Sequence, residues 1–358
     1  MAEIIILKNA QIDGVITDVT VKSGKIESVG KSNGEGKIID LEGALLFPGL
    51  VDIHTHGANG LDTMDSDVYE LARYLKSVGT TSFLATTMSD SIENVKKITN
   101  REIDNTNEDK ANLLGFHVEG PYISKKYKGA QNEDFIKNPD ICEFSELKNV
   151  KMITVAPELE GAMDFIRAVR NSGISVALGH TDADFDIADK ALKNGACCLT
   201  HTFNAMPPFL HRSTGPIGAA LVNNSFVQVI CDGEHIHYSA ILALYKMFGA
   251  NRMILISDSM RATGLSDGEY SFGNQKINVQ NGIARTKNGN LAGSTATLFD
   301  CVKRAIEFGI PAADAFKMAS LTPATLLNLK KGRIEAGYDA EFVVADESYN
   351  LIEAYNFK

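Results

Sequence analysis

A short apolar run leads directly into two histidines in the stretch LVDIHTH, residues 50–56. A continuous apolar run of this kind is typical of a strand that is buried on both faces of a parallel sheet. Because side chains two positions apart on a strand point to the same face, His54 and His56 are placed to hold one cation. A histidine pair with this spacing also arises by chance or as a hydrogen-bonded polar pair, so it does not identify a metal site alone.

Four more residues suited to metal binding or proton transfer follow apolar runs elsewhere in the chain: Glu119, His180, His201 and Asp258. Each also has an ordinary structural interpretation, as a salt-bridged or helix-capping carboxylate or as a hydrogen-bonded histidine. The repetition is more informative than any one residue, because the catalytic groups of a strand-and-helix barrel come from the C-terminal ends of several strands. The pattern therefore predicts one assembled site.

The apolar runs alternate with amphipathic stretches, which is the pattern of repeated strand-helix units. Helical spacing is clear at residues 68–75, 163–169 and 240–247, and a glycine suited to a C-terminal cap lies just beyond each. The fold class that we expect is α/β, with a (β/α)8 TIM-like barrel. Its strands are predicted at residues 50–53, 81–86, 113–118, 151–155, 174–178, 198–200, 227–231 and 253–257.

Both ends of the chain differ from the predicted barrel in their pattern of apolar and polar residues. Residues 3–47 contain short period-two runs separated by turn residues, and residues 332–346 return to the same strand-and-turn pattern. We therefore expect residues 1–47 and 332–358 to form one small β-sandwich domain, with the barrel in residues 48–331.

The composition argues against several classes of function. A formal net charge of −10 weighs against binding to nucleic acid or to an anionic membrane, both of which need a basic surface. No stretch approaches the roughly 20 apolar residues that cross a bilayer. The first residues lack the features of a signal peptide, so a cytoplasmic location is the default expectation. The five cysteines form no C-x-x-C pair, and we expect them to be reduced and mostly buried.

Six motifs stand out along the chain: PGLVDIHTHG at residues 48–57, HVEGP at 117–121, GHT at 179–181, THTFNAM at 200–206, DGEH at 232–235 and LAGS at 291–294. Together they resemble the motifs of the N-acetylglucosamine-6-phosphate deacetylases of the amidohydrolase superfamily. The resemblance implies a TIM-like barrel with a small β-domain built from both chain ends. It also implies metal-dependent hydrolysis of the acetamide of N-acetyl-D-glucosamine 6-phosphate to D-glucosamine 6-phosphate and acetate, in amino-sugar catabolism or recycling.

The resemblance assigns roles to the residues at the strand ends. It implies that the principal metal is held by Glu119, His180 and His201 and that Asp258 is the catalytic acid and base. His54 and His56 match the pair found in members that hold a second cation, which Glu119 would bridge. One or two divalent ions per subunit are therefore expected, and Zn, Fe, Mn and Co all suit such a mixed set of ligands.

The resemblance also implies which residues contact the substrate: Ala130, Gln131, Asn204, Ala205, Arg212, His235, Leu291, Ala292 and Gly293. Backbone amides of Asn204 and Ala205 would face the ligand, and Arg212 and His235 match contacts to the phosphate. Many members carry histidine where Gln131 stands. A homodimer is implied as well, because in such dimers the arginine of one subunit can reach the site of its partner.

Two other classes of function stay open at this point. One is a deacetylase of N-acetylgalactosamine 6-phosphate, or another amidohydrolase, since a fold by itself does not decide the substrate. The other is a non-catalytic scaffold, against which the intact ligands and Asp258 argue. For the deacetylase that the resemblance implies, the binding partner is a small molecule, an amino-sugar phosphate.

Overall fold

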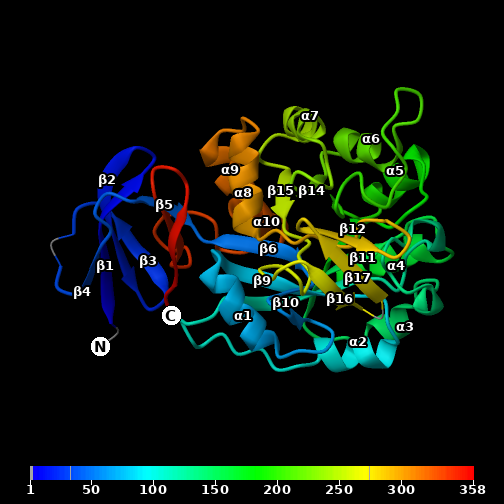
Figure 1. The fold of residues 1–358 in the computed structure, drawn as a ribbon, viewed down its shortest axis with the longest axis horizontal. Coiled ribbons are helices and arrows are strands. Elements are labelled where there is room, and N and C mark those ends of the chain that lie inside the picture. The colour runs from blue at the N-terminus through cyan, green and yellow to red at the C-terminus, as the bar shows by residue number, and fades with distance from the viewer. Residues whose placement is uncertain (1–2, 33, 274) are drawn as a thin grey trace.

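The computed structural model describes residues 3–32, 34–273 and 275–358. A barrel of eight parallel strands stands at its centre (Figure 1). The strands neighbour one another in chain order, and the last contacts the first, so the sheet comes close to a full circle. They are β6 (Leu50–Thr55), β9 (Thr80–Thr87), β10 (Asn112–Glu119), β11 (Val150–Val155), β12 (Ser175–Leu178), β13 (Cys198–Leu199), β14 (Phe226–Ile230) and β15 (Met253–Ile256). All eight predicted strands are present, which confirms the barrel.

The helices surround the barrel and bury one side each. The three predicted helices are α1 (Val68–Ser77), α4 (Ala162–Asn171) and α7 (Tyr238–Phe248). Gly79 lies just beyond α1 with a φ of 95°, a left-handed conformation that glycine adopts without steric cost. The other helices are α2 (Ile92–Thr99), α3 (Ile141–Phe144), α5 (Phe185–Lys193), α6 (Gly215–Val222), α8 (Leu298–Glu307), α9 (Ala312–Met318) and α10 (Leu321–Leu326). None of the helices in the described part of the chain is long and apolar enough to cross a membrane.

Strands from both chain ends form one sheet beside the barrel, as expected (Figure 1). Its members are β1 (Ile4–Ile12), β2 (Val15–Lys22), β3 (Lys25–Val29), β4 (Lys37–Asp40), β5 (Leu45–Pro48), β19 (Glu341–Ala345) and β20 (Leu351–Asn356). The two ends of the chain meet where β19 pairs antiparallel with β5. Strand β1 pairs with β2, β4 and β5, and the module encloses its own apolar core, which includes Leu7, Val19 and Phe342.

A buried carboxylate joins this module to the N-terminal ends of the barrel strands. Glu341 of β19 accepts hydrogen bonds from Thr81 Oγ1 at 2.9 Å and Ser82 Oγ at 2.8 Å, both in β9. It also accepts from Asn112 Nδ2 of β10 at 2.5 Å and pairs with the buried Lys331. The functional residues lie at the opposite, C-terminal ends of the strands.

A small antiparallel sheet follows the last barrel strand, and the sequence analysis did not predict it. It consists of β16 (Gly268–Phe272), β17 (Gln275–Gln280) and β18 (Ile283–Thr286), which we call the flap. Its apolar face packs against Met88 and Ala130, which come from loops after β9 and β10. The flap therefore lies over the C-terminal face of the barrel.

The five cysteines are free, and Cys198, Cys231 and Cys301 are buried, in agreement with the sequence analysis.

Candidate active site

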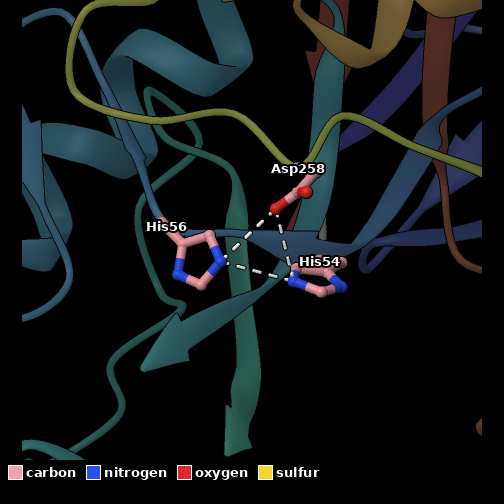
Figure 2. A group of neighbouring side chains, drawn as sticks. All are labelled: His54, His56 and Asp258. Atoms are coloured by element: carbon pink, nitrogen blue, oxygen red, sulfur yellow. Dashed lines mark hydrogen bonds and ion pairs between the residues drawn. The ribbon is translucent and has the colours of Figure 1, made fainter. Parts of the chain in front are cut away.

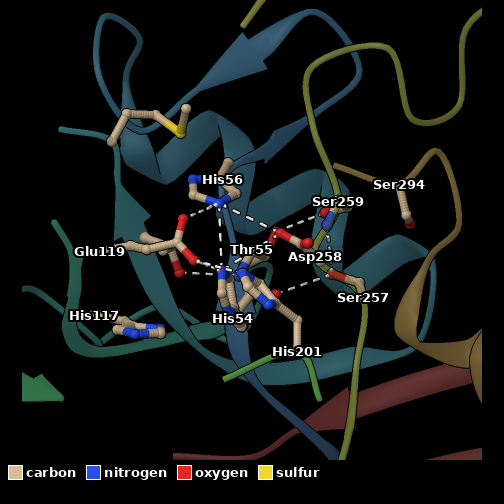
Figure 3. A network of polar contacts seen from close by, with 12 residues as sticks. His54, Thr55, His56, His117, Glu119, His201, Ser257, Asp258, Ser259 and Ser294 are labelled. Atoms are coloured by element: carbon tan, nitrogen blue, oxygen red, sulfur yellow. Dashed lines mark hydrogen bonds and ion pairs between the residues drawn. The ribbon is translucent and has the colours of Figure 1, made fainter. Parts of the chain in front are cut away.

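Six side chains meet at the C-terminal face of the barrel, and Figure 3 labels all of them except His180. His54 lies within β6 and His56 just after it, while Glu119 is the last residue of β10. His180, His201 and Asp258 each stand two residues beyond a strand end, with φ values of 46°, 24° and 47°. Residues other than glycine adopt such positive φ values rarely, and at these three strand ends the surrounding structure holds the backbone in that conformation.

Glu119 lies between the histidines. Its Oε1 is 3.3 Å from Nε2 of His54, 3.3 Å from Nε2 of His180 and 3.2 Å from Nε2 of His201. Its Oε2 is 3.3 Å from Nε2 of His56. One carboxylate therefore contacts histidines from three separate strands.

Asp258 completes a second group with the two histidines of β6 (Figure 2). Its Oδ1 is 3.4 Å from Nε2 of His54 and 3.4 Å from Nε2 of His56. The backbone around Asp258 is held from two sides, because its N–H donates to the carbonyl of His54 at 2.9 Å and its carbonyl accepts from Ser294 N–H at 2.7 Å. These bonds hold the backbone of Asp258 at the floor of the site.

The donor atoms have the spacing of a metal-binding site. They form two buried triads, His54 with His56 and Asp258, and Glu119 with His180 and His201, in which the ligand atoms lie within 4.8 Å of one another. Two nitrogens that bind one cation at about 2.0–2.1 Å stand roughly 2.9–3.4 Å apart. The observed Nε2 separations are 3.3 Å for His54 and His56 and 3.0 Å for His180 and His201. Buried Glu119 Oε1 has no hydrogen-bond donor among the described residues, which suits a metal ligand. The side chains therefore fit a divalent cation.

The charges in this cluster shift one another's pKa values. Burial by itself would lower the pKa of His56, but hydrogen bonds to Asp258 and Glu119 outweigh it and raise that pKa to about 10. Burial would raise the pKa of Asp258, yet the charge on His54 and the hydrogen bond from His56 lower it to about 2. Against the same effect of burial, His54 and His180 hold the pKa of Glu119 well below its usual range. Both carboxylates are therefore ionised at neutral pH.

The histidines are oriented through their other ring nitrogen. His180 Nδ1 lies 2.8 Å from the carbonyl of Tyr127, His201 Nδ1 lies 3.2 Å from the carbonyl of Asn204, and His54 Nδ1 lies 3.0 Å from Oε1 of Gln228. Each acceptor takes the Nδ1–H, so in the neutral form of each ring, the form that binds a metal, the Nε2 lone pair faces the cluster.

His117 has a structural role. Its Nδ1 donates to the carbonyl of Ile53 at 3.1 Å, and its Nε2 accepts from Thr154 Oγ1 at 2.8 Å. Burial lowers the pKa of His117 well below its usual value, so the ring is neutral.

A pocket of about 390 Å³ opens above the cluster. Its lining includes every residue that the sequence analysis assigned to the site, except His54 and Arg212. His54 lies fully buried beneath the floor, in contact with Glu119 and Asp258. Arg212 lies on an exposed loop before α6 and does not line the pocket of its own chain. The assigned residues that do line it are His56, Glu119, Ala130, Gln131, His180, His201, Asn204, Ala205, His235, Asp258, Leu291, Ala292 and Gly293.

His235 reaches the pocket with its ring held by a carboxylate. Its Nδ1 donates to Asp232 Oδ2 at 2.7 Å, and Asp232 Oδ1 accepts the backbone N–H groups of Glu234 and His235 at 2.9 Å each. Burial would lower the pKa of His235, but the bond to Asp232 outweighs it and raises that pKa. The ring therefore favours the cationic form, which suits a phosphate group.

Several residues of the site were missed by the sequence analysis. Phe272 of the flap lies edge-on to His56, with ring centroids 5.0 Å apart, and Lys126 and Tyr127 line the pocket. No local signal marks Phe272, because its position depends on the packing of the flap. Gln228 could have been found, since it is a polar residue inside the buried strand β14.

Sequence comparison links this chain to enzymes of the amidohydrolase family, in agreement with the cluster of possible metal ligands. The sequence profile of the amidohydrolase family matches residues 45–357. The N-acetylglucosamine-6-phosphate deacetylase of Lysinibacillus sphaericus is 37% identical over 347 residues, which cover 92% of this chain and 89% of that protein. The N-acetylgalactosamine-6-phosphate deacetylase of Escherichia coli O157:H7 is 31% identical, and the match covers 88% of this chain and 87% of that protein.

Two crystal structures have closely similar folds. The N-acetylglucosamine-6-phosphate deacetylase from Thermotoga maritima has a TM-score of 0.89 and 36% identity, covering 98% of this chain and 97% of that one. The enzyme from Mycobacterium smegmatis, an aspartate-to-alanine variant in complex with N-acetyl-D-glucosamine-6-phosphate, has a TM-score of 0.87 and 27% identity, covering 98% and 96%. With its barrel, its clustered ligands and these full-length relatives, the chain belongs to the amidohydrolase family.

Proposed function

We propose that this protein hydrolyses the acetamide of N-acetyl-D-glucosamine 6-phosphate to D-glucosamine 6-phosphate and acetate. The observation that carries the proposal is the convergence of four histidines, Glu119 and Asp258 on the floor of one pocket. The names of the full-length relatives support the same reaction, as does the sugar phosphate bound to the related mycobacterial enzyme. This complete set of ligands and Asp258 argues against a non-catalytic scaffold.

The site suits two divalent ions: His54, His56 and Asp258 would hold one, and Glu119, His180 and His201 would hold the other. The contacts of Glu119 support this number, because its Oε1 faces His180, His201 and His54 while its Oε2 faces His56. A divalent cation here supplies Lewis-acid chemistry, which polarises an amide carbonyl and makes a nearby water easier to deprotonate. Zn, Fe, Mn and Co all suit imidazole and carboxylate ligands.

Asp258 is the proton carrier in this proposal. Its carboxylate is ionised at neutral pH and lines the pocket, so it can accept a proton from the attacking water. The same carboxyl group then delivers the proton to the sugar nitrogen as the C–N bond breaks. The backbone contacts to His54 and Ser294 hold it in place for both transfers.

The phosphate group is proposed to bind at the side of the pocket that carries His235, Asn204 and Ala205. Arg212 reaches this region only from a second subunit in our proposal, because it does not line the pocket of its own chain. The same loop exposes Phe209 by 39% and Leu210 by 53%, which suits burial in a homodimer. A membrane or a nucleic acid has no role in this reaction, and the cytoplasmic location stays a prediction.

The galactosamine epimer is the second candidate substrate, because the related protein from Escherichia coli O157:H7 carries that name. The test is acetate release from both N-acetylhexosamine 6-phosphates, from the unphosphorylated sugars and from chelator-treated protein. We expect fastest release from the glucosamine compound and none after chelation. Faster release from the galactosamine compound would establish the epimer instead, and release from neither would refute the deacetylase.

The shared site has its own test. Arg212→Ala and Asp258→Asn chains, each inactive alone, are mixed so that they exchange subunits. Recovered activity is expected, because a mixed dimer contains one site with both native residues, and no recovery in a proven mixed dimer would contradict a shared site.

A further inference from the structure

Gln131 is nearly fully buried beside the metal-binding cluster, with 2% of its surface exposed. Its Nε2 donates a hydrogen bond of 2.7 Å to Oε2 of Glu119. Its Oε1 accepts the backbone N–H of Ser89 at 2.6 Å. Because a backbone N–H can only donate, it fixes the orientation of the amide and requires the NH₂ group to face Glu119.

Both polar atoms of the Gln131 side chain already have contacts within the protein. The remaining contact of Nε2 is with Met88 Sδ at 3.7 Å, and the backbone N–H of Gln131 closes a turn to the carbonyl of Lys128 at 2.9 Å. Gln131 therefore connects the loop after β9, the end of β10 and its own loop at one point.

The contact is made to one particular oxygen of Glu119. Oε2 is the oxygen that faces His56, whereas Oε1 faces His180, His201 and His54. A hydrogen-bond donor to Oε2 prevents the carboxylate from rotating. It therefore determines the position of Oε2 relative to His56.

We propose that Gln131 is a positioning residue of the metal centre. It holds Oε2 of Glu119 and thereby sets the affinity of the ion that His54, His56 and Asp258 bind. The inference rests on the two-ion site proposed above and goes beyond it, because the sequence resemblance assigns Gln131 to the sugar. Loss of such an outer contact to a metal ligand lowers metal affinity by about 10–100-fold.

Two other buried or half-buried glutamines provide matched controls. Gln228 holds His54 from inside the barrel, since its Oε1 is 3.0 Å from His54 Nδ1. Gln275 of the flap donates to the carbonyl of Ala130 at 2.9 Å, so it supports the same loop as Gln131 without touching a ligand. The same substitution at the three positions separates an effect on a ligand from loosening of the loop.

The experiment is stepwise Mn²⁺ titration of metal-free protein, followed by chelator competition and by electron paramagnetic resonance. In the unaltered protein we expect two binding steps and the signal of a coupled Mn²⁺ pair. Gln131→Met should weaken one step by about 10–100-fold and leave the other unchanged. At limiting Mn²⁺, single-ion signals should replace the coupled signal. Gln228→Met should weaken the same step, and Gln275→Met should change neither.

Other outcomes overturn the proposal. Unchanged metal steps with a raised KM for the sugar phosphate in Gln131→Met would mean that the residue contacts substrate instead. An equal loss in Gln275→Met would mean that only the loop matters. Gln131→His keeps an N–H donor and should restore the weakened step, which keeps the test decisive if the methionine variant folds poorly. Failure of the unaltered protein to bind two ions would refute the two-ion site, whereas absence of deacetylation with both ions bound would refute only the reaction.

Discussion

Replacing Asp258 by asparagine tests the proposed proton transfer most directly. The substitution keeps the size of the side chain but removes the charge and the basic oxygen that lies 3.4 Å from Nε2 of both His54 and His56. The carboxyl group has a pKa of about 2, so in the unaltered protein it is ionised throughout the neutral range. General acid–base catalysis contributes about 10²–10⁴-fold to a rate. The expected loss in kcat is therefore about 10²–10⁴-fold, or roughly 2.7–5.4 kcal/mol of activation free energy.

The assay is acetate release at saturating N-acetyl-D-glucosamine 6-phosphate. Because Oδ1 of Asp258 also belongs to a metal-binding triad, the ions must be supplied in excess and the bound metal measured by elemental analysis. Asp267→Asn, a change at an exposed aspartate of the flap region, is the control and should keep full activity. The base assignment is refuted if Asp258→Asn, with its full metal content, retains activity within about tenfold of the unaltered protein.

Three further outcomes are expected. Asp232→Asn removes the hydrogen bond that raises the pKa of His235, so the ring should lose its proton at a lower pH than in the unaltered protein. Because inhibition by inorganic phosphate needs the cationic ring, that inhibition should also disappear at a lower pH. Identical pH profiles of inhibition for the two proteins would contradict this. Glu341→Gln leaves buried Lys331 with Asp339 as its remaining ionic partner. It should reduce the unfolding free energy, measured by chemical denaturation, by about 3 kcal/mol. An unchanged denaturation midpoint would show that the Lys331–Glu341 pair contributes little to stability. Chelation should reduce the unfolding free energy by about 2.7 kcal/mol for each ion present at 100 times its Kd, and this loss should lower the thermal unfolding midpoint; an unaltered midpoint would argue against bound metal.

Local signals in the sequence were sufficient for the barrel. Each buried strand is a continuous apolar run, as in Met253–Ile256, and such a run indicates a buried strand before its neighbours are known. The chemical residues stand just beyond those runs, so the common face of His180, His201 and Asp258 followed from the parallel order of the strands. The flap was missed although β17 carries the period-two alternation of a half-buried strand, with Ile277 and Val279 buried; its neighbour β16 has only one buried residue, Phe272, and shows no such pattern.

The sequence by itself therefore determined the barrel strands, the module formed by both chain ends and the six side chains that follow the strands and meet in the cluster. Only the tertiary structure decided which atoms meet. It brought Gln131 against one oxygen of Glu119, brought Gln228 against His54 and left Arg212 outside the pocket of its own chain. The physical reason is that secondary structure follows local periodicity, whereas a contact of about 3 Å depends on how segments far apart in the chain pack together.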